Sequence, residues 1–146
     1  KLLIFYNGVH MVLDPNKPAY LCSGHLEGTL NVGTIRLDGF AGMTVDAEAS
    51  ARAGKPGMLV TQPVTVRNTS LAVNVEGHKR SARVALLDER GRMIGGYELE
   101  NCLPIAEDAV RAEVRWKERS DVSALRGQQV SLLVQMSAGT IYALRM

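Results

Sequence analysis

The sequence has few aromatic residues, no long hydrophobic run and little net charge. Phe, Trp and Tyr make up 5% of its 146 residues, which argues against binding of single-stranded nucleic acid by base stacking. No apolar run reaches the roughly 18 residues that a membrane-spanning helix needs. The net charge is +2, and acidic residues alternate with basic ones, so no basic stripe is expected. We therefore expect neither a nucleic-acid partner nor a membrane partner.

Cysteines and metal-binding motifs are scarce as well. Cys22 and Cys102 are the only two cysteines, and they either pair in an oxidising compartment or, as we favour, are buried as small apolar residues. Neither has a neighbour at CxxC spacing, so no zinc site is expected. A calcium site at Ser120 and Asp121 would offer one carboxylate, which is poor for a hard cation. The sequence also lacks known nucleophile and phosphate-loop motifs, so we predict no catalytic residue, metal or cofactor.

What the sequence does contain is a series of short segments with the two-residue periodicity of β-strands. Residues 110–116 alternate apolar and charged side chains, which is typical of a strand with one buried face. Residues 71–76 alternate in the same way. Pro63 interrupts the run 58–67, which indicates an edge strand or two short pieces. The pattern predicts an all-β fold, an antiparallel β-sandwich of the jelly-roll type.

Turn residues place two hairpins in this fold. One is expected over residues 82–99, turning at 88–91, and the other over residues 129–146, turning at 137–139. Two sheets would then pack face to face around a common core. The residues expected in that core are Val73, Val75, Val84, Leu86, Val114, Trp116, Leu132, Val134 and Tyr142.

Helical signals are weak. Residues 46–54 are rich in Ala and end in Gly, and they fit a single helical turn and a polar loop equally well. Residues 121–127 predict a short turn, in which Asp121 caps the start, Leu125 points inward and Gly127 ends the turn.

The first 37 residues differ from the rest. They include a buried-type apolar run, residues 2–5, and the chain opens like the interior of a longer protein. We expect residues 1–37 to form an N-terminal β-hairpin and residues 38–146 to form the sandwich. An exposed strand edge of this kind invites association, so we expect these strands to pack on the sandwich or to pair with a second copy in a homodimer.

Several motifs carry a resemblance to a known family. They include DERGRMIGG, CLPI, VRW and SDVSALRG within residues 83–146, together with LVTQPVTV, LAVNVEG and GTIRLDGF before them. In this combination the chain resembles the C-terminal end of bacterial glycoside-hydrolase-like proteins, in which a five-bladed β-propeller precedes a β-sandwich. Residues 1–37 are similar to the closing strands of that propeller. The chain departs from the pattern at Glu118 and Arg119, where a Gly pair is usual, and at Leu144, where an aromatic residue is usual.

The resemblance implies a noncatalytic accessory or carbohydrate-binding-like module, because the blades that carry the catalytic carboxylates of such enzymes are missing from this sequence. One alternative is that the chain is the tail of a glycosidase. Another is that it is a structural or oligomerisation module without a ligand. Candidate partners are a carbohydrate and a second copy of the chain. Carbohydrate-active members of the family are often exported, although no export signal is visible.

The candidate binding residues gather near the only tryptophan. We favour Trp116 as a core residue, and the alternative is a stacking platform for a sugar ring, supported by Tyr97. Lys117 and Asp121 would then lie beside it on a solvated loop. The resemblance adds His10, which follows a turn that lies near the central cavity of such propellers, although the interpretation that we favour is a surface histidine on a long loop.

Glu98 and Glu100 are candidate paired carboxylates for glycoside hydrolysis. On one strand face they would lie about 7 Å apart, which falls within the range of inverting enzymes. Solvated glutamates on a strand have the same spacing, and we favour that interpretation.

Overall fold

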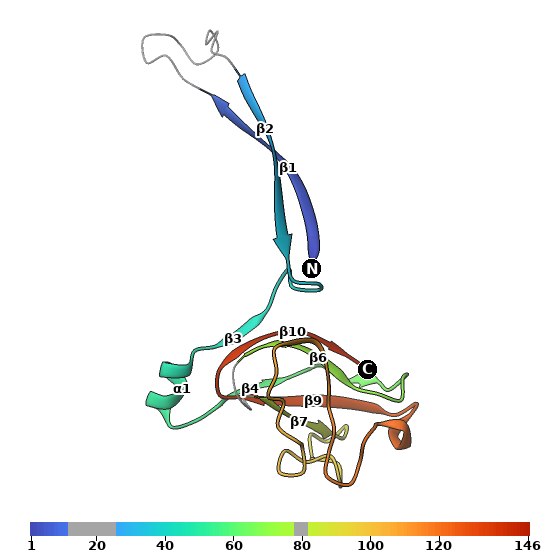
Figure 1. The fold of residues 1–146 in the computed structure, drawn as a ribbon. Helices are drawn as coiled ribbons and strands as arrows, with labels where there is room; N and C mark the ends of the chain where they lie inside the picture. Colours follow the sequence, from blue (N-terminus) through green and yellow to red (C-terminus); the bar gives the residue numbers. More distant parts are fainter. Residues whose placement is uncertain (12–25, 78–81) are drawn as a thin grey trace. The chain divides into compact units, whose positions relative to one another are not determined.

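The computed structural model describes residues 1–11, 26–77 and 82–146 (Figure 1). The chain divides into two compact units, Lys1–Leu37 and Asp38–Met146. The first is a hairpin and the second holds two antiparallel sheets. The chain is therefore all-β, with sheets that do not close into a barrel, as the alternation predicted.

The hairpin consists of two ten-residue strands, β1 (Leu2–Met11) and β2 (Leu26–Ile35). They pair antiparallel without a register shift, so that Phe5 lies opposite Val32 and Asn7 lies opposite Leu30. Residues directly opposite each other in such a pair project from the same face. The register therefore decides which side chains share a face of the hairpin.

The first sheet of the second unit has the strand order β3, β10, β6, β8. β3 (Met43–Val45) and β8 (Ala109–Glu113) are its edges, and β10 (Gly139–Arg145) and β6 (Ala72–Glu76) are central. All neighbours pair antiparallel. The apolar face of this sheet is directed toward the second sheet.

The second sheet is built around β9 (Gln129–Met136), which pairs with β7 (Ala82–Leu87) along one side. The other side pairs with two short strands, β4 (Gly57–Val60) and β5 (Val64–Thr65). Pro63 lies between these two strands, where its lack of an N–H costs no hydrogen bond of the sheet. The run that contains Pro63 is thus an edge strand in two short pieces.

β9 and β10 belong to different sheets, so the hairpin expected over residues 129–146 is wrong. Residues 137–138 instead cross from one sheet to the other. Gly139 then enters β10 with a φ of 106°, and a Cβ atom there would collide with the backbone of Glu76. The small turn residues at 137–139 fit a hairpin and a crossing between sheets equally well. Only the pairing partners of β9 and β10 distinguish the two connections.

The core lies between the two sheets and draws on both of them. Tyr142 is the one predicted core residue that is not buried, because β10 has a bulge between Ile141 and Ala143 that shifts the alternation. Its hydroxyl forms a hydrogen bond with the Glu76 carboxylate instead. The other predicted core residues are all buried: Val73, Val75, Val84, Leu86, Val114, Trp116, Leu132 and Val134.

The Ala-rich segment forms a helix, α1 (Ala47–Ala53), although none of its residues is buried. The Asp46 carboxylate accepts a hydrogen bond from the third helical N–H at 2.7 Å, and Gly54 ends the helix in the left-handed conformation. The two caps thus decide between the helical turn and the polar loop, which the composition leaves open. Among the described residues, no helix has both the length and the apolar character to cross a membrane.

The short turn after Asp121 is present as a 3-10 turn, η2 (Ser123–Leu125). The Asp121 carboxylate accepts a hydrogen bond from the Ser123 N–H at 3.0 Å. Leu125 is buried, and Gly127 follows with a φ of 82°. The burial predicted for Leu125 is confirmed, whereas the N-cap of η2 is Val122 and its C-cap is Arg126, so Asp121 and Gly127 lie one residue outside the predicted cap positions.

The hairpin expected after β7 is present only in its turn. Asp88 and Arg92 close that turn through their backbone groups at 2.8 Å. Beyond it, Leu87 and Met93 form a single bridge instead of a second strand. Residues 94–97 then turn again, closed by a 2.9 Å backbone hydrogen bond. The two glycines at 95–96 turn the chain, and no second strand forms between β7 and β8.

Candidate functional site

Trp116 lies in the core and seals one edge of the second sheet. Its ring is 2% exposed, and its Nε1–H donates a hydrogen bond to the Val84 carbonyl oxygen at 3.0 Å. Val84 belongs to β7, whose only partner among the described strands is β9. The core role favoured for Trp116 is therefore confirmed. The stacking platform is corrected, since the ring has no free face for a sugar.

The Cys102 side chain covers the second outward backbone group of Val84, its N–H. The Val84 N–H donates to the Cys102 Sγ atom at 3.2 Å, so side chains satisfy both outward backbone groups of this residue. Burial raises the pKa of the Cys102 thiol, which keeps it protonated at neutral pH. Cys102 is a buried free thiol, and Cys22 lies outside the described residues.

Tyr97 packs against this seal and does not form a surface platform. Its ring meets the Trp116 ring edge to face, with centroids 5.0 Å apart and planes at 80°. The Arg119 guanidinium lies 5.6 Å from the centroid of the Tyr97 ring, a distance typical of cation–π contacts. Tyr97 is 2% exposed, and its hydroxyl has no hydrogen-bond partner within the described part of the chain.

The polar candidates around this cluster are already used or solvated. Lys117 is exposed. Asp121 accepts hydrogen bonds from the hydroxyl and the N–H of Ser123, and these two bonds, the hydroxyl first, lower the pKa of the carboxyl group. His10 lies on β1 opposite Glu27, in the other unit, and its side chain is outside the described residues. The structure thus brings Trp116 and Tyr97 together, but as packing.

Glu98 and Glu100 do not lie on a strand, so the paired-carboxylate spacing is wrong. Both residues belong to a turn. The Glu98 carboxylate accepts hydrogen bonds from the Gly96 N–H at 2.9 Å and the Asn101 amide at 2.6 Å. The Glu98 N–H, Asn101 and Gly96 lower the pKa of this carboxyl group, in that order. Glu98 therefore holds the turn that follows the glycine pair.

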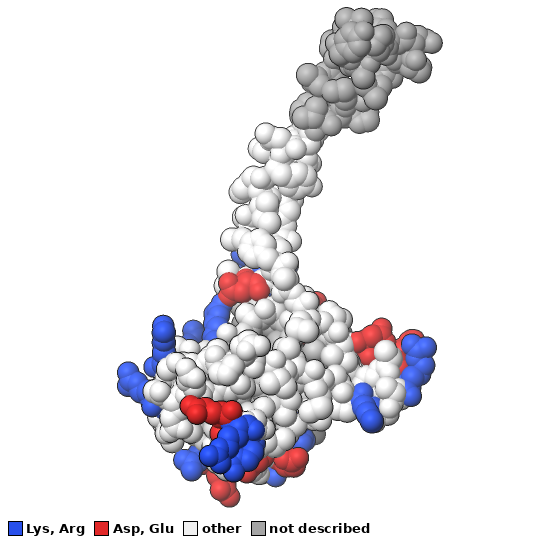
Figure 2. Space-filling model, turned by 180° about the vertical axis from the view of Figure 1, so that it is seen from behind, with Lys and Arg blue, Asp and Glu red and all other residues white. Residues whose placement is uncertain are grey.

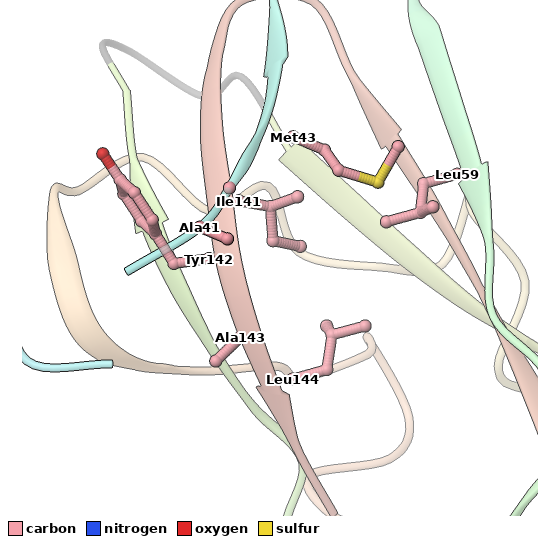
Figure 3. A pocket seen from close by; sticks show the side chains of 8 residues that line it. Ala41, Met43, Leu59, Ile141, Tyr142, Ala143 and Leu144 are labelled. Atoms are coloured by element: carbon pink, nitrogen blue, oxygen red, sulfur yellow. The ribbon is translucent and has the colours of Figure 1, made fainter. Parts of the chain in front are cut away.

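An apolar cleft opens between the two sheets, next to β3, β10 and β4 (Figure 3). The side chains of Met43, Leu59, Ile141 and Leu144 face the same space, and Tyr142 points away from it. Its volume is about 270 Å³. A site that orients a polar ligand needs a few convergent polar groups, which this cleft does not offer. Across the residues that the structure describes, no three His, Cys, Asp or Glu side chains form a metal-binding group either.

The hairpin carries several strongly exposed apolar side chains. Leu3, Phe5, Leu30 and Val32, which we call the apolar stripe, share one face of β1 and β2 through the strand register. Their exposed fractions run from 58% to 76%. In the view of Figure 2, charged side chains gather on the sandwich, whereas the part of the hairpin drawn in white shows few of them. Exposed apolar patches of this kind mark interaction surfaces.

Searches against family models, curated proteins and solved structures found no match to this chain. The resemblance to glycoside-hydrolase-like proteins therefore rests on the sequence motifs alone.

Proposed function

We propose that this chain is a noncatalytic accessory β-sandwich module that assembles through its N-terminal hairpin. The observation that carries this proposal is the apolar stripe. The β-sandwich is the folded body, and the hairpin is the contact element. For the chain by itself, the partner that we propose is a second copy.

The hairpin needs a partner for a physical reason. An isolated two-stranded hairpin is marginally stable in water, and three or more strands or a covered apolar face are needed for stability. The four side chains of the stripe are exposed and none of them is charged, and charged side chains are what discourages strand pairing. Burying one apolar side chain of this size contributes about 1.5–3 kcal/mol. Covering four of them would stabilise the hairpin substantially.

A second copy fits the stripe because the stripe is self-complementary. It holds no charged residue, so two copies do not repel each other when their stripes meet. Twofold interfaces, in which the same patch serves both subunits, are the commonest kind in soluble oligomers. Ten-residue strands span about 33 Å, which provides a long contact. We therefore propose stripe-to-stripe packing of two hairpins.

The noncatalytic assignment rests on how the candidate residues are used. Trp116 and Tyr97 are packed together, and the carboxylates of Asp121 and Glu98 hold turns. Association with a glycoside-hydrolase-like protein follows from the resemblance and remains part of the proposal. In that context the hairpin would join a sheet of a preceding propeller-type domain, and this is the main alternative to self-association.

Sedimentation velocity of the complete chain tests the proposal. We expect a monomer–dimer equilibrium in the micromolar range for the unchanged protein. Val32→Asp places a charge in the stripe of both copies and should weaken the dimer at least about 100-fold, given the apolar contacts that it removes. Ile4→Asp is the matched control, because Ile4 is a partly exposed residue of the same hairpin on its opposite face.

The control should retain the dimer. If Ile4→Asp dissociates the protein as fully as Val32→Asp does, the stripe is not the interface. If the unchanged chain is a monomer throughout the micromolar range, self-association is excluded, and the hairpin must then be covered by a different domain.

A further inference from the structure

Four arginines that are distant in sequence line one depression on the second unit. They are Arg67, Arg111, Arg126 and Arg145, and residues 68–70, Asn-Thr-Ser, line it with them. The depression has a volume of about 400 Å³. We call it the arginine pocket. It is separate from the seal at Trp116 and from the apolar cleft, since it shares no lining residue with either.

The strand register brings two of these arginines to the same face of the first sheet. Arg145 on β10 pairs with Ala72 on β6, and Ala72 pairs with Glu113 on β8. Arg111 precedes Glu113 by two positions, so it projects from the same face. Ala72 also lines the pocket, and its small side chain leaves room between the two arginines.

Backbone hydrogen bonds bring the other two arginines together. The Val66 N–H donates to the Gln128 carbonyl at 3.0 Å, and the Gly127 N–H donates to the Val66 carbonyl at 2.9 Å. These bonds tie the residue before Arg67 to the residues just after Arg126. A third bond, from the Val122 N–H to the Thr69 carbonyl at 2.9 Å, fixes the polar loop beside them. Backbone hydrogen bonds therefore hold the segments that line the pocket.

The positive charge in the pocket is only partly neutralised. Arg145 forms an ion pair with Asp38. Within residues 1–11, 26–77 and 82–146, Arg67, Arg111 and Arg126 have no ion pair. Like charges that are gathered in one place repel each other and oppose the compact state. A bound anion would relieve this repulsion.

We infer that the arginine pocket binds an oxyanion, namely a sulfate, phosphate or carboxylate group of a ligand. The guanidinium group presents a planar fork of N–H donors that matches the oxygens of such groups, often with two hydrogen bonds. The Asn68 amide and the hydroxyls of Thr69 and Ser70 add neutral donors and acceptors at the rim. No aromatic side chain lines the pocket, so it lacks the stacking surface of a nucleic-acid strand site. This inference does not depend on dimer formation.

Nuclear magnetic resonance titration of the complete chain tests the inference. Sodium sulfate, sodium phosphate and sodium glucuronate are added separately at constant ionic strength, and the arginine Nε–Hε signals are followed. We expect saturable shifts at Arg67, Arg111 and Arg126. The double variant Arg111→Gln/Arg126→Gln should weaken binding at least about tenfold, because it removes two charge-assisted contacts.

Two further variants separate specific binding from general charge. Arg52→Gln on α1 removes one exposed charge that does not line the pocket, and it should leave the affinity unchanged. Arg111→Lys keeps the charge but loses the planar fork, and an intermediate affinity is expected. Circular dichroism of each variant confirms that it is folded.

The three anions also identify the source of the oxyanion. Binding of sulfate and phosphate alone assigns a tetrahedral group, and equal binding of glucuronate assigns a carboxylate of an acidic sugar. Linear shifts without saturation, or the same affinity in the double variant, would overturn the inference. A DNA duplex that binds more tightly than all three anions would also overturn it, because the pocket would then belong to an extended phosphate surface.

Discussion

The two units of this chain use β-strands in opposite ways. The hairpin has the longest strands of the described chain, ten residues each, yet it leaves its apolar side chains in solvent. The sandwich includes strands of two and three residues, yet it buries a continuous core. The stability of a β-structure thus depends on a second layer more than on strand length.

The edges of the two units differ in the same sense. In the sandwich, β3 is a three-residue edge, β8 carries the exposed charges Arg111 and Glu113, and β7 is sealed by Cys102 and Trp116. Short strands, charges and covering side chains are the usual ways in which proteins prevent edge-to-edge association. β1 and β2 are long, and the apolar stripe on them is exposed and uncharged, which fits the proposal that the hairpin pairs.

The same substitution in each unit should give the largest contrast. Val134→Asp buries a charge in the core, where the valine is 2% exposed, and should cost more than about 4 kcal/mol of unfolding free energy. In the monomer, at concentrations below the dimer dissociation constant, Val32→Asp leaves its charge in water and should change that free energy by about 0.5 kcal/mol or less. Urea unfolding followed by Trp116 fluorescence measures both. Equal losses would show that the hairpin residue is as buried as the core residue.

Removal of the indole tests the seal on β7. Trp116→Ala should lower the free energy of unfolding by about 3–5 kcal/mol, because it leaves a cavity and an unpaired Val84 carbonyl. Trp116→Phe keeps most of the packing and loses only the N–H donor, so about 1–3 kcal/mol is expected. Circular dichroism is the measurement, since both variants lack the tryptophan signal. A loss below 1 kcal/mol for the alanine variant would contradict the core role.

Tyr97→Phe should act in the opposite direction. The buried hydroxyl has no partner within the described residues, so its removal should raise the free energy of unfolding by about 1 kcal/mol. The ring contact with Trp116 is kept. Chemical denaturation of the two proteins side by side gives the difference. A clear loss of stability would mean that the hydroxyl forms a hydrogen bond in solution.

The smallest expected effect is a pH dependence at the turn after β7. The Arg92 backbone N–H and the Arg92 side chain, in that order, lower the pKa of Asp88. A carboxyl group with a lowered folded-state pKa stabilises the fold above its unfolded pKa, near 4, and this contribution is lost as the pH falls through the folded-state value. Carbon-13 titration of the Asp88 carboxyl group measures the shift. Asp88→Asn should flatten this part of the acid dependence, and an unshifted titration would contradict the hydrogen bonds.

Local patterns predicted those parts of the fold that depend on local chemistry. The alternation over residues 110–116 identified the buried positions of Val114 and Trp116, and Pro63 correctly divided an edge strand. Asp121, Leu125 and Gly127 mark a turn through a side-chain hydrogen bond to the Ser123 N–H, a buried apolar anchor and a positive φ. Each of these signals acts within a few residues.

The features that sequence reasoning missed depend on pairing across the chain. The turn between β9 and β10 has hairpin residues, but its strands join different sheets. The bulge that displaces Tyr142 contains no glycine, so the sequence gives no signal for it. The arginines of the pocket come from four separate segments, and a net charge of +2 conceals their convergence. The strand register and the backbone hydrogen bonds of the loops place them together.

Because Cys102 is hydrogen-bonded to Val84, the reactivity of its thiol reports local opening at the edge of β7. A thiol that accepts a backbone N–H at 3.2 Å and is 2% exposed cannot meet an alkylating reagent until that edge separates. The rate at which the Cys102 peptide gains mass during alkylation therefore follows the opening equilibrium of this strand. Local unfolding at this edge can therefore be measured by peptide mass spectrometry at a native cysteine, and no engineered labelling site is needed.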